Sequence, residues 1–281
     1  MLKKLSNFLH FVKIEHTFFS LPMIFSGVFL SAHELPRIST LVLILVAATG
    51  ARSVALALNR IIDREIDKRN PRTLIRELPS GKMSYREALS VLLVGAIAYF
   101  ASAALISTFC LMLSPIPLIV FTLYPYMKRF TPFCHFGVGV GLAMAPLGGW
   151  FSVHPTMSGF LPAALLALFT MFWVSGFDVI YSTLDELFDR QENLYSFSSK
   201  YGKVRALRYS AYLHALAFVS LGLLFALYIK AIVALPFLIL TGILLFLENK
   251  KAEDVELAFF KINAFLGFSV LGMVVMGVLF A

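Results

Sequence analysis

Two rows of acidic residues are the part of this sequence best suited to chemistry. In the first row, Asn59, Asp63 and Asp67 follow one another at intervals of four residues. On a helix this spacing places the three side chains on one face, one turn apart. Two carboxylates one turn apart repel each other unless a cation lies between them. Mg²⁺ is a cation of this kind, because it binds one or two carboxylates together with substrate phosphates. The first row therefore predicts a divalent-cation site.

The second row has the same character. Asp178, Tyr181, Asp185 and Asp189 follow at intervals of three, four and four residues, which again predicts one face of a helix. Asp178 comes directly after the strongly apolar segment 160–177. A carboxylate at the end of such a segment is costly without a partner and indicates a functional site. A single acid here is most simply a solvated residue, but two aligned rows favour a shared site.

Basic residues lie close to both rows. A diphosphate needs metal ions together with guanidinium or ammonium groups, and arginine holds phosphate oxygens through paired hydrogen bonds. The positive charge of cytoplasmic loops in membrane proteins already explains most of these residues. The residues concerned are Lys68, Arg69, Arg72, Arg76, Lys82, Lys128 and Arg129.

The composition predicts a membrane protein. Of the 281 residues, 59% are hydrophobic and only 14% are charged, and the mean hydropathy is +0.83. A soluble domain needs more charge to cover its surface. The apolar runs are long and continuous, as in spans of about 20 helical residues, and do not alternate as in a barrel. We expect no cleavable signal peptide and interpret the first apolar run as a membrane helix.

We therefore predict an all-α, polytopic membrane protein with one domain over residues 1–281 and about nine transmembrane helices. With the N-terminus in the cytoplasm, cytoplasmic segments and adjoining helix ends hold all Lys and Arg except Arg37, Arg52 and Lys230. Both acidic rows then fall on the cytoplasmic side. We interpret the glycines between 137 and 149 as sites of close helix packing. The expected helices cover residues 16–33, 38–62, 84–108, 111–127, 133–153, 159–181, 206–229, 231–247 and 257–280.

The motifs together resemble a known family. They are Asn59-xxx-Asp63-xxx-Asp67, Asn70-Pro71-Arg72-Thr73-xx-Arg76-xx-Pro79-xx-Lys82, Tyr124-Pro125-xx-Lys128-Arg129 and Asp178-xx-Tyr181-xxx-Asp185-xxx-Asp189. This set resembles the UbiA superfamily of intramembrane prenyltransferases, in particular the 4-hydroxybenzoate polyprenyltransferases and their menaquinone-pathway relatives. The resemblance covers essentially the whole chain. Many members carry Asp directly after the first Asn, whereas this chain has Arg60.

The resemblance implies a role for each motif residue. Asp63, Asp67, Asp185 and Asp189 would bind two Mg²⁺ ions. Tyr181 would orient the site, and Asn59 and Asp178 would support metal or diphosphate binding. The diphosphate oxygens would be bound by Arg72, Arg76 and Lys128.

The implied reaction transfers a polyprenyl group from polyprenyl diphosphate to a small aromatic acceptor, most simply 4-hydroxybenzoate, in respiratory quinone biosynthesis. The chain would work in the bacterial inner membrane among lipids and would bind no nucleic acid. A naphthoate or another menaquinone precursor is the alternative acceptor, and a porphyrin is a more remote one.

Arg52 stands apart from the basic loops. It precedes Asn59 by seven residues, which places it two turns deeper on nearly the same helix face. An arginine facing lipid at that depth is costly. We hypothesise that Arg52 binds the carboxylate or another polar group of the acceptor. A purely structural pairing of a buried arginine is an equal alternative.

Two other classes of protein fit parts of the pattern. A cation-coupled transporter also places acids inside the membrane, but typically near the midplane, whereas these acids lie at helix ends beside basic loops. A non-catalytic lipid-binding scaffold needs no aligned carboxylates. The enzyme interpretation accounts for more of the sequence than either.

Overall fold

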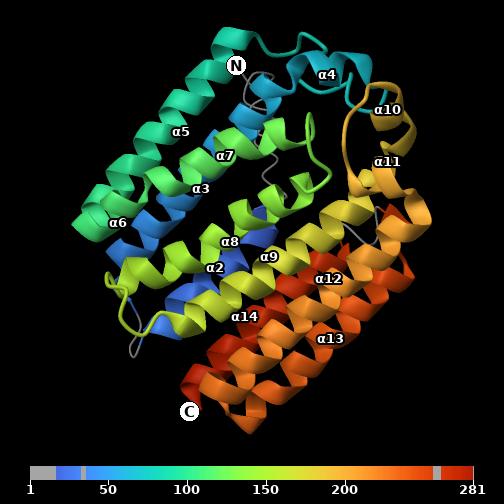
Figure 1. Cartoon of the computed structure of the whole chain (residues 1–281). Helices are drawn as coiled ribbons and strands as arrows, with labels where there is room; N and C mark the ends of the chain where they lie inside the picture. Colours follow the sequence, from blue (N-terminus) through green and yellow to red (C-terminus); the bar gives the residue numbers. More distant parts are fainter. Residues whose placement is uncertain (1–16, 33–35, 256–260, 281) are drawn as a thin grey trace. The chain divides into compact units, whose positions relative to one another are not determined.

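The computed structural model describes residues 17–32, 36–255 and 261–280, and within these ranges the regular structure is helical throughout (Figure 1). The helices are α2 (Thr17–Ser31), α3 (Ile38–Ile62), α4 (Arg64–Arg69), α5 (Tyr85–Ile106), α6 (Thr108–Leu113), α7 (Pro115–Met127), α8 (Cys134–Val153), α9 (Leu161–Ser182), α10 (Glu186–Gln191), α11 (Phe197–Tyr201), α12 (Lys203–Leu224), the π-helix η2 (Phe225–Ile229), the 3-10 helix η3 (Ile232–Ala234), α13 (Leu235–Lys250) and α14 (Asn263–Leu279).

The helices confirm a polytopic membrane fold. Seven described helical segments are long and apolar enough to cross a membrane, and two shorter apolar helices, Ser20–Ser31 and Asn263–Leu279, lie where the first and last spans were expected. The ends of those two expected spans, at residues 16, 33 and 257–260, lie outside the described residues. The expected fourth span starts earlier than predicted, at Thr108, because α6 precedes α7 and Pro115 begins the second of the two.

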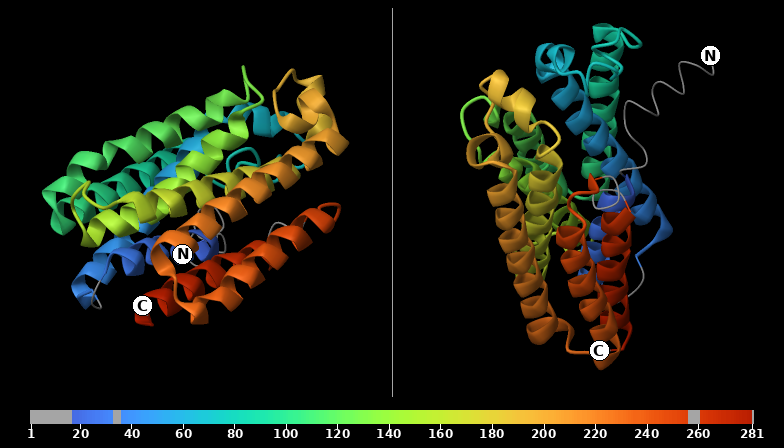
Figure 2. Two further views of the ribbon diagram at one scale, coloured as in Figure 1. Left: turned by 60° about the horizontal axis from the view of Figure 1, so that its bottom comes forward. Right: turned by 90° about the vertical axis from the view of Figure 1, so that its right-hand side faces the viewer.

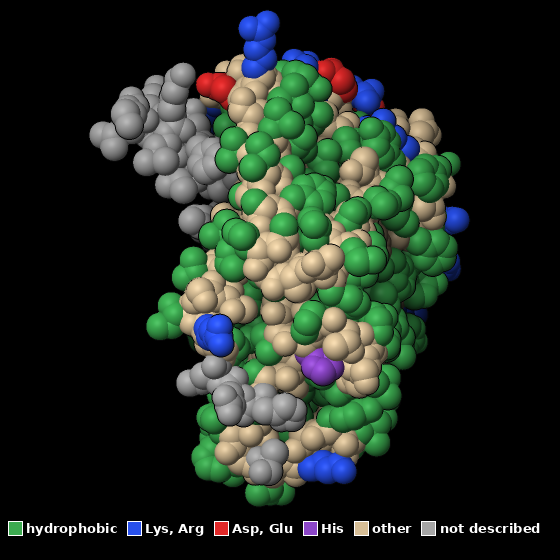
Figure 3. All heavy atoms as spheres, turned by 90° about the vertical axis from the view of Figure 1, so that its left-hand side faces the viewer, with side chains coloured by type: hydrophobic (Ala, Val, Ile, Leu, Met, Phe, Trp, Pro, Cys, Tyr) green, Lys and Arg blue, Asp and Glu red, His purple; other side chains and the backbone are tan. Residues whose placement is uncertain are grey.

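The surface suits a lipid environment. Large apolar side chains are exposed along α3 and α5, including Ile38, Ile97 and Leu105. On the face drawn in Figure 3, hydrophobic side chains cover most of the area and acidic side chains gather at the upper edge. A water-exposed protein rarely presents apolar surface on this scale.

The chain forms two compact units. Among the described residues, the first contains Thr17 and Arg37–Tyr126, and within it α3 packs along α5. The backbones approach closely at Gly50, where an added Cβ would lie 2.6 Å from the carbonyl oxygen of Gly95. This contact fixes the part of α3 that leads to the first acidic row.

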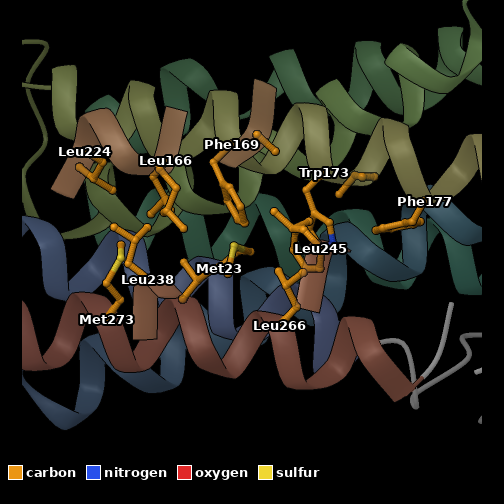
Figure 4. Close-up of a cluster of buried hydrophobic side chains, with 14 of the residues drawn as sticks. Met23, Leu166, Phe169, Trp173, Phe177, Leu224, Leu238, Leu245, Leu266 and Met273 are labelled. Carbon is orange, nitrogen blue, oxygen red and sulfur yellow. The ribbon is translucent and has the colours of Figure 1, made fainter. Parts of the chain in front are cut away.

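The second unit contains Phe18–Pro36 and Met127–Ala281, and α9 lies at its centre. Of the most apolar window of α9, 72% is buried, more than in any other described span. Figure 4 shows Phe169 and Trp173 of α9 packed among leucines of neighbouring helices, with Met23 of α2 and Met273 of α14 nearby. Figure 2 shows α13 beside α12 and α14. This packing gives the end of α9, and so Asp178, a fixed support.

A polar network crosses this apolar core. The Trp173 indole N–H donates to Asn263 Oδ1 at 2.7 Å, and Asn263 Nδ2 donates to Glu248 Oε1 at 2.9 Å. On the other side, Asn249 Nδ2 lies 2.7 Å from His214 Nδ1, and His214 Nε2 lies 3.3 Å from the Trp173 carbonyl oxygen. Polar side chains of this kind join helices inside a membrane. The network links α9, α12, α13 and α14 in one register.

Candidate active site

The first acidic row spans the junction of α3 and α4. Helix α3 ends at Ile62, and Asp63, at φ −92° and ψ 1°, separates it from α4. The chain bends at Asp63, directly after the end of the expected helix 38–62, and the four-residue steps of the row continue across the bend. The Asp63 N–H donates to the Asn59 carbonyl at 3.0 Å, and the Asp67 N–H donates to the Asp63 carbonyl at 2.8 Å. The Asn59 side chain also donates to Asp63 Oδ2 at 3.2 Å.

Both carboxylates of this row are buried. Asp63 and Asp67 are each only 3% exposed. Arg76 Nη1 lies 2.8 Å from Oδ1 and 2.9 Å from Oδ2 of Asp67. A carboxylate removed from water needs such a partner, because its desolvation is costly. The structure thus brings a residue predicted to bind diphosphate directly onto a predicted metal ligand.

The loop after α4 explains why Arg76 returns to Asp67. Asn70 is buried, and its Oδ1 accepts the N–H of Arg72 at 2.9 Å. The Thr73 hydroxyl donates to the Asp67 carbonyl at 3.2 Å. Asparagine and threonine side chains commonly form such turns with the nearby backbone. The Asn-Pro-Arg-Thr motif therefore shapes the loop that carries both predicted phosphate-binding arginines.

The second acidic row is also divided. Helix α9 carries Asp178 and Tyr181 and ends at Ser182, whereas Asp185 stands at the start of α10, which carries Asp189. The expected single helical face is wrong here, because a tight turn intervenes. The Asp185 N–H donates to the Ser182 carbonyl at 3.1 Å. This spacing of three residues is that of a 3-10 turn, whereas an α-helix has a spacing of four.

Asp189 lies in a half-buried position next to α11. Its Oδ2 accepts the hydroxyl of Ser196 at 3.0 Å. Burial raises the pKa of Asp189 from 3.8 to about 6. The Ser196 hydrogen bond lowers this pKa, the charge of Asp185 raises it, and the charge of Lys128 lowers it. A carboxylate in this setting gains from a cation close by.

Asp178 has a partner that the sequence did not reveal. Its Oδ2 lies 2.7 Å from Nδ1 of His135, which is 2% exposed at the start of α8. The ring Nε2 of His135 accepts the backbone N–H of Phe197 at 3.2 Å. No sequence spacing connects residues 43 positions apart. The one available signal was a histidine in the first turn of an apolar helix.

The remaining predicted residues lie as follows. Arg52 and Arg72 are partly buried, and the departure at position 60 is an arginine only 3% exposed. Arg60 therefore lies inside the first unit rather than in a solvated loop. In the second unit, the carbonyl of Lys128 accepts the N–H of Tyr195 at 2.7 Å, which joins the start of that unit to the loop after α10.

The residues present fit magnesium. Among the described residues, no three His, Cys, Asp or Glu side chains gather as a ready metal site. Mg²⁺ takes few protein carboxylates and completes its octahedron with phosphate oxygens and water. The buried Asp63 and Asp67, with Arg76 bound to Asp67, are therefore a suitable donor set.

Comparison with known proteins decides the family. The model of the UbiA prenyltransferase family matches residues 20–278. The chain belongs to this family. A UbiA homologue from Aeropyrum pernix K1, solved in its apo form, is 33% identical, with a TM-score of 0.85 over 92% of this chain and 96% of that one. The chain therefore has the UbiA fold that its motifs predicted.

More distant UbiA proteins share the fold or part of the sequence. A homologue from Archaeoglobus fulgidus bound to GPP and Mg²⁺ is 19% identical, with a TM-score of 0.71 over 94% of this chain and 99% of that one. The 4-hydroxybenzoate octaprenyltransferase of Photobacterium profundum is 29% identical over 181 residues, or 63% of this chain and 61% of that protein. The chain thus spans about 61% of the length of this curated relative.

Proposed function

We propose that this UbiA-family protein transfers a prenyl group from a prenyl diphosphate to a small aromatic acceptor within the membrane. The observation that carries the proposal is the buried Asp63–Asp67 pair with Arg76 bound to Asp67. This pair combines the groups that a metal-bound diphosphate requires. The Archaeoglobus homologue bound to GPP and Mg²⁺ supports the same ligand class.

In this proposal both acidic rows bind the same diphosphate through Mg²⁺. Asp63, Asp67, Asp185 and Asp189 would hold the ions, with Asn59 and Asp178 supporting them and Tyr181 orienting the site. When bound, Mg²⁺ supplies neutralisation of the negative charge that grows on the leaving diphosphate.

The side chains of the protein would guide the reaction itself. Arg72, Arg76 and Lys128 bind diphosphate oxygens and stabilise the leaving group most strongly as its charge develops. The allylic C–O bond breaks, a carbon of the electron-rich ring bonds to the allylic carbon, and the ring then loses a proton. Apolar helices keep water away from the allylic cation.

We propose 4-hydroxybenzoate as the acceptor, with a naphthoate of the menaquinone pathway as the alternative. The curated relatives named 4-hydroxybenzoate octaprenyltransferase support the first choice. Arg52, partly buried in α3, is proposed to bind the acceptor carboxylate. Arg52→Ala should raise the KM for the acceptor more than the KM for prenyl diphosphate. Equal increases in both constants would contradict this role.

The test is direct assay of the purified protein with a labelled polyprenyl diphosphate, 4-hydroxybenzoate or 1,4-dihydroxy-2-naphthoate, and either Mg²⁺ or EDTA. We expect a Mg²⁺-dependent prenylated product that Asp67→Asn and Asp189→Asn abolish. Glu65→Gln is the matched control, because Glu65 precedes Asp67 by two residues but its side chain is 71% exposed and pairs with Lys68. No product from any phenolic or naphthoic acceptor would overturn the proposal.

The proposal includes a cytoplasmic N-terminus and the bacterial inner membrane as the location. Reporter fusions to the two termini test the topology, because nine spans place the termini on opposite sides. We do not propose a cation-coupled transporter, since Asp63 directly follows α3 and Asp185 lies three residues after the end of α9, so neither is in the middle of a span.

A further inference from the structure

His135 is a buried polar residue whose two ring nitrogens are both engaged. It is 2% exposed, with Nδ1 2.7 Å from Asp178 Oδ2 and Nε2 3.2 Å from the N–H of Phe197. The Phe197 ring also packs edge-on against the imidazole, with 5.4 Å between centroids. A polar group in an apolar bundle is stable only when it is satisfied in this way.

These contacts determine the tautomer of the imidazole. The backbone N–H of Phe197 can only donate, so Nε2 must be the unprotonated nitrogen that accepts it. The single ring proton then resides on Nδ1 and points at Asp178. An imidazolium would set two N–H groups against each other at Nε2. His135 therefore donates through Nδ1 to one oxygen of Asp178, whose side chain is still 25% exposed.

The same contacts reach the far end of the second acidic row. Phe197 is the first residue of α11, and Ser196 directly precedes it. The Ser196 hydroxyl donates to Asp189 Oδ2 at 3.0 Å and accepts the N–H of Ser199, also at 3.0 Å. Two consecutive residues at the start of α11 thus touch both ends of the row, Ser196 directly and Phe197 through His135.

We propose that His135 is a positioning residue of the metal–diphosphate site, which orients Asp178 and keeps it in register with Asp189 through the start of α11. The inference rests on the proposed function, because the alignment of Asp178 with Asp189 matters only if both carboxylates act on the same bound ligand. Partners that orient metal-binding carboxylates are worth about 10–100-fold in affinity or activity.

The test compares substitutions that separate hydrogen bonding from ring shape. His135→Phe keeps a ring but neither hydrogen bond, whereas His135→Gln carries an N–H donor and a carbonyl acceptor at the end of its side chain. Phe133→Leu is the control, because Phe133 packs on Phe197 with 5.7 Å between ring centroids and its side chain cannot form a hydrogen bond with Asp178. The measurement is Mn²⁺ binding by EPR in the presence of geranyl S-thiolodiphosphate, a probe that does not react.

We expect His135→Phe to weaken Mn²⁺ binding by about 10–100-fold, His135→Gln to restore most of it, and Phe133→Leu to bind as the parent does. Parent-like binding by His135→Phe, or equal losses in the Phe and Gln variants, would overturn the inference. If the Phe variant does not fold, ¹⁵N NMR of histidine-labelled parent protein still tests it. A protonated Nδ1 with an unprotonated Nε2 supports the inference, and any other form contradicts it.

The binding assay separates this inference from the proposed function, because it needs no acceptor. Weakened binding in His135→Phe together with no prenylated product in the parent would reject the acceptor chemistry and keep the positioning role. The opposite result is a parent that prenylates its acceptor and a His135→Phe variant with unchanged Mn²⁺ affinity and unchanged KM for prenyl diphosphate. That result would keep the proposed function and reject the positioning role.

Discussion

Arg76 Nη1 lies within hydrogen-bonding distance of both carboxylate oxygens of Asp67, at 2.8 Å and 2.9 Å. One of these residues is proposed to bind diphosphate and the other a magnesium ion, and in the pair each neutralises the charge of the other. A metal at Asp67 must therefore compete with the guanidinium. Binding of the diphosphate relieves this competition, because its oxygens give Arg76 a new partner.

We predict that Arg76→Ala destabilises the protein and makes its stability depend on metal. The substitution leaves Asp67 buried without its partner, and removing one member of a buried ion pair costs about 3–5 kcal/mol. Mg²⁺ can then take the place of the guanidinium. Thermal unfolding in detergent should show a lower Tm in EDTA and a larger Mg²⁺-induced rise than in the parent, while affinity for prenyl diphosphate falls.

Lys68→Ala provides the control for this experiment. Lys68 pairs with Glu65 at 3.0 Å in the same segment, but both side chains are exposed, and such pairs contribute little. Its Tm should match the parent with or without Mg²⁺. An Arg76→Ala variant that behaves in the same way would show that the Arg76–Asp67 contact has no energetic role.

Metal affinity should depend on pH through Asp189. Because burial raises its pKa to about 6, Asp189 becomes protonated as the pH falls through that value and Mn²⁺ binding weakens. The Ser196 hydroxyl stabilises the ionised form, so Ser196→Ala should move the midpoint to higher pH. EPR titrations between pH 5 and 8 measure both curves. A midpoint that stays fixed or moves to lower pH in the variant would contradict this assignment.

The folded-state pKa of Asp189 also has a consequence for stability without metal. Its folded value lies above its ordinary value of 3.8. The stability that it contributes is therefore fully present below about pH 3.8 and is lost as the pH rises through about 6. Asp189→Asn should remove this part of the pH dependence.

Glu248 offers a test of the buried polar network. It is fully buried, and among the described residues its Oε2 has no hydrogen-bond partner, while Oε1 accepts from Asn263. Glu248→Gln keeps the acceptor for Asn263 and brings no carboxyl charge into the bundle, so its Tm should equal or exceed that of the parent. Glu248→Ala should cost about 1–3 kcal/mol, because it removes the buried acceptor to which the Asn263 amide donates. Equal stability of both variants would show that the network does not hold the helices.

Two adjacent glycines of α8 predict opposite outcomes. A Cβ at Gly149 would collide with the carbonyl of Ile24 on α2, whereas one at Gly148 meets no described atom within 4 Å. Gly149→Ala should therefore destabilise by about 1–3 kcal/mol through overpacking, and Gly148→Ala should be neutral or stabilising through its helix propensity. Thermal unfolding of the two variants decides. A stable Gly149→Ala variant would contradict the close contact of α2 with α8.

The spans could be predicted because continuous apolar runs need lipid. The expected helix 38–62 agrees with α3 at both ends. Gly139 and Gly149 of α8 lie at close helix contacts as expected, whereas the expectation is wrong for Gly148, where an added Cβ meets no described atom within 4 Å. The expected helices 38–62 and 159–181 end close to the breaks, but the sequence could not show how each acidic row continues beyond its helix. A bend at Asp63 or a tight turn before Asp185 preserves the spacing of the acids, so sequence periodicity is the same with or without it.

The residue types of the site were visible in the sequence, but their partners were not. Asp67 was assigned to metal and Arg76 to phosphate. No sequence pattern shows that the intervening loop folds back and brings Arg76 into contact with Asp67. The pairing of His135 with Asp178 depends on how α8 packs against α9. Contacts of this kind arise from tertiary packing and leave no periodic signal.

The central claim is that the two acidic rows bind one metal–diphosphate complex, and a double-mutant cycle on Asp67 and Asp189 tests it most directly. Mn²⁺ affinity is measured with geranyl S-thiolodiphosphate for the parent, Asp67→Asn, Asp189→Asn and the double variant, with Glu65→Gln as control. The effects of two substitutions are coupled when both residues bind the same ligand. The double variant should therefore lose about 0.5–3 kcal/mol less Mn²⁺-binding free energy than the two single variants lose together. Strictly additive losses, or single variants that bind as the parent does, would contradict the account.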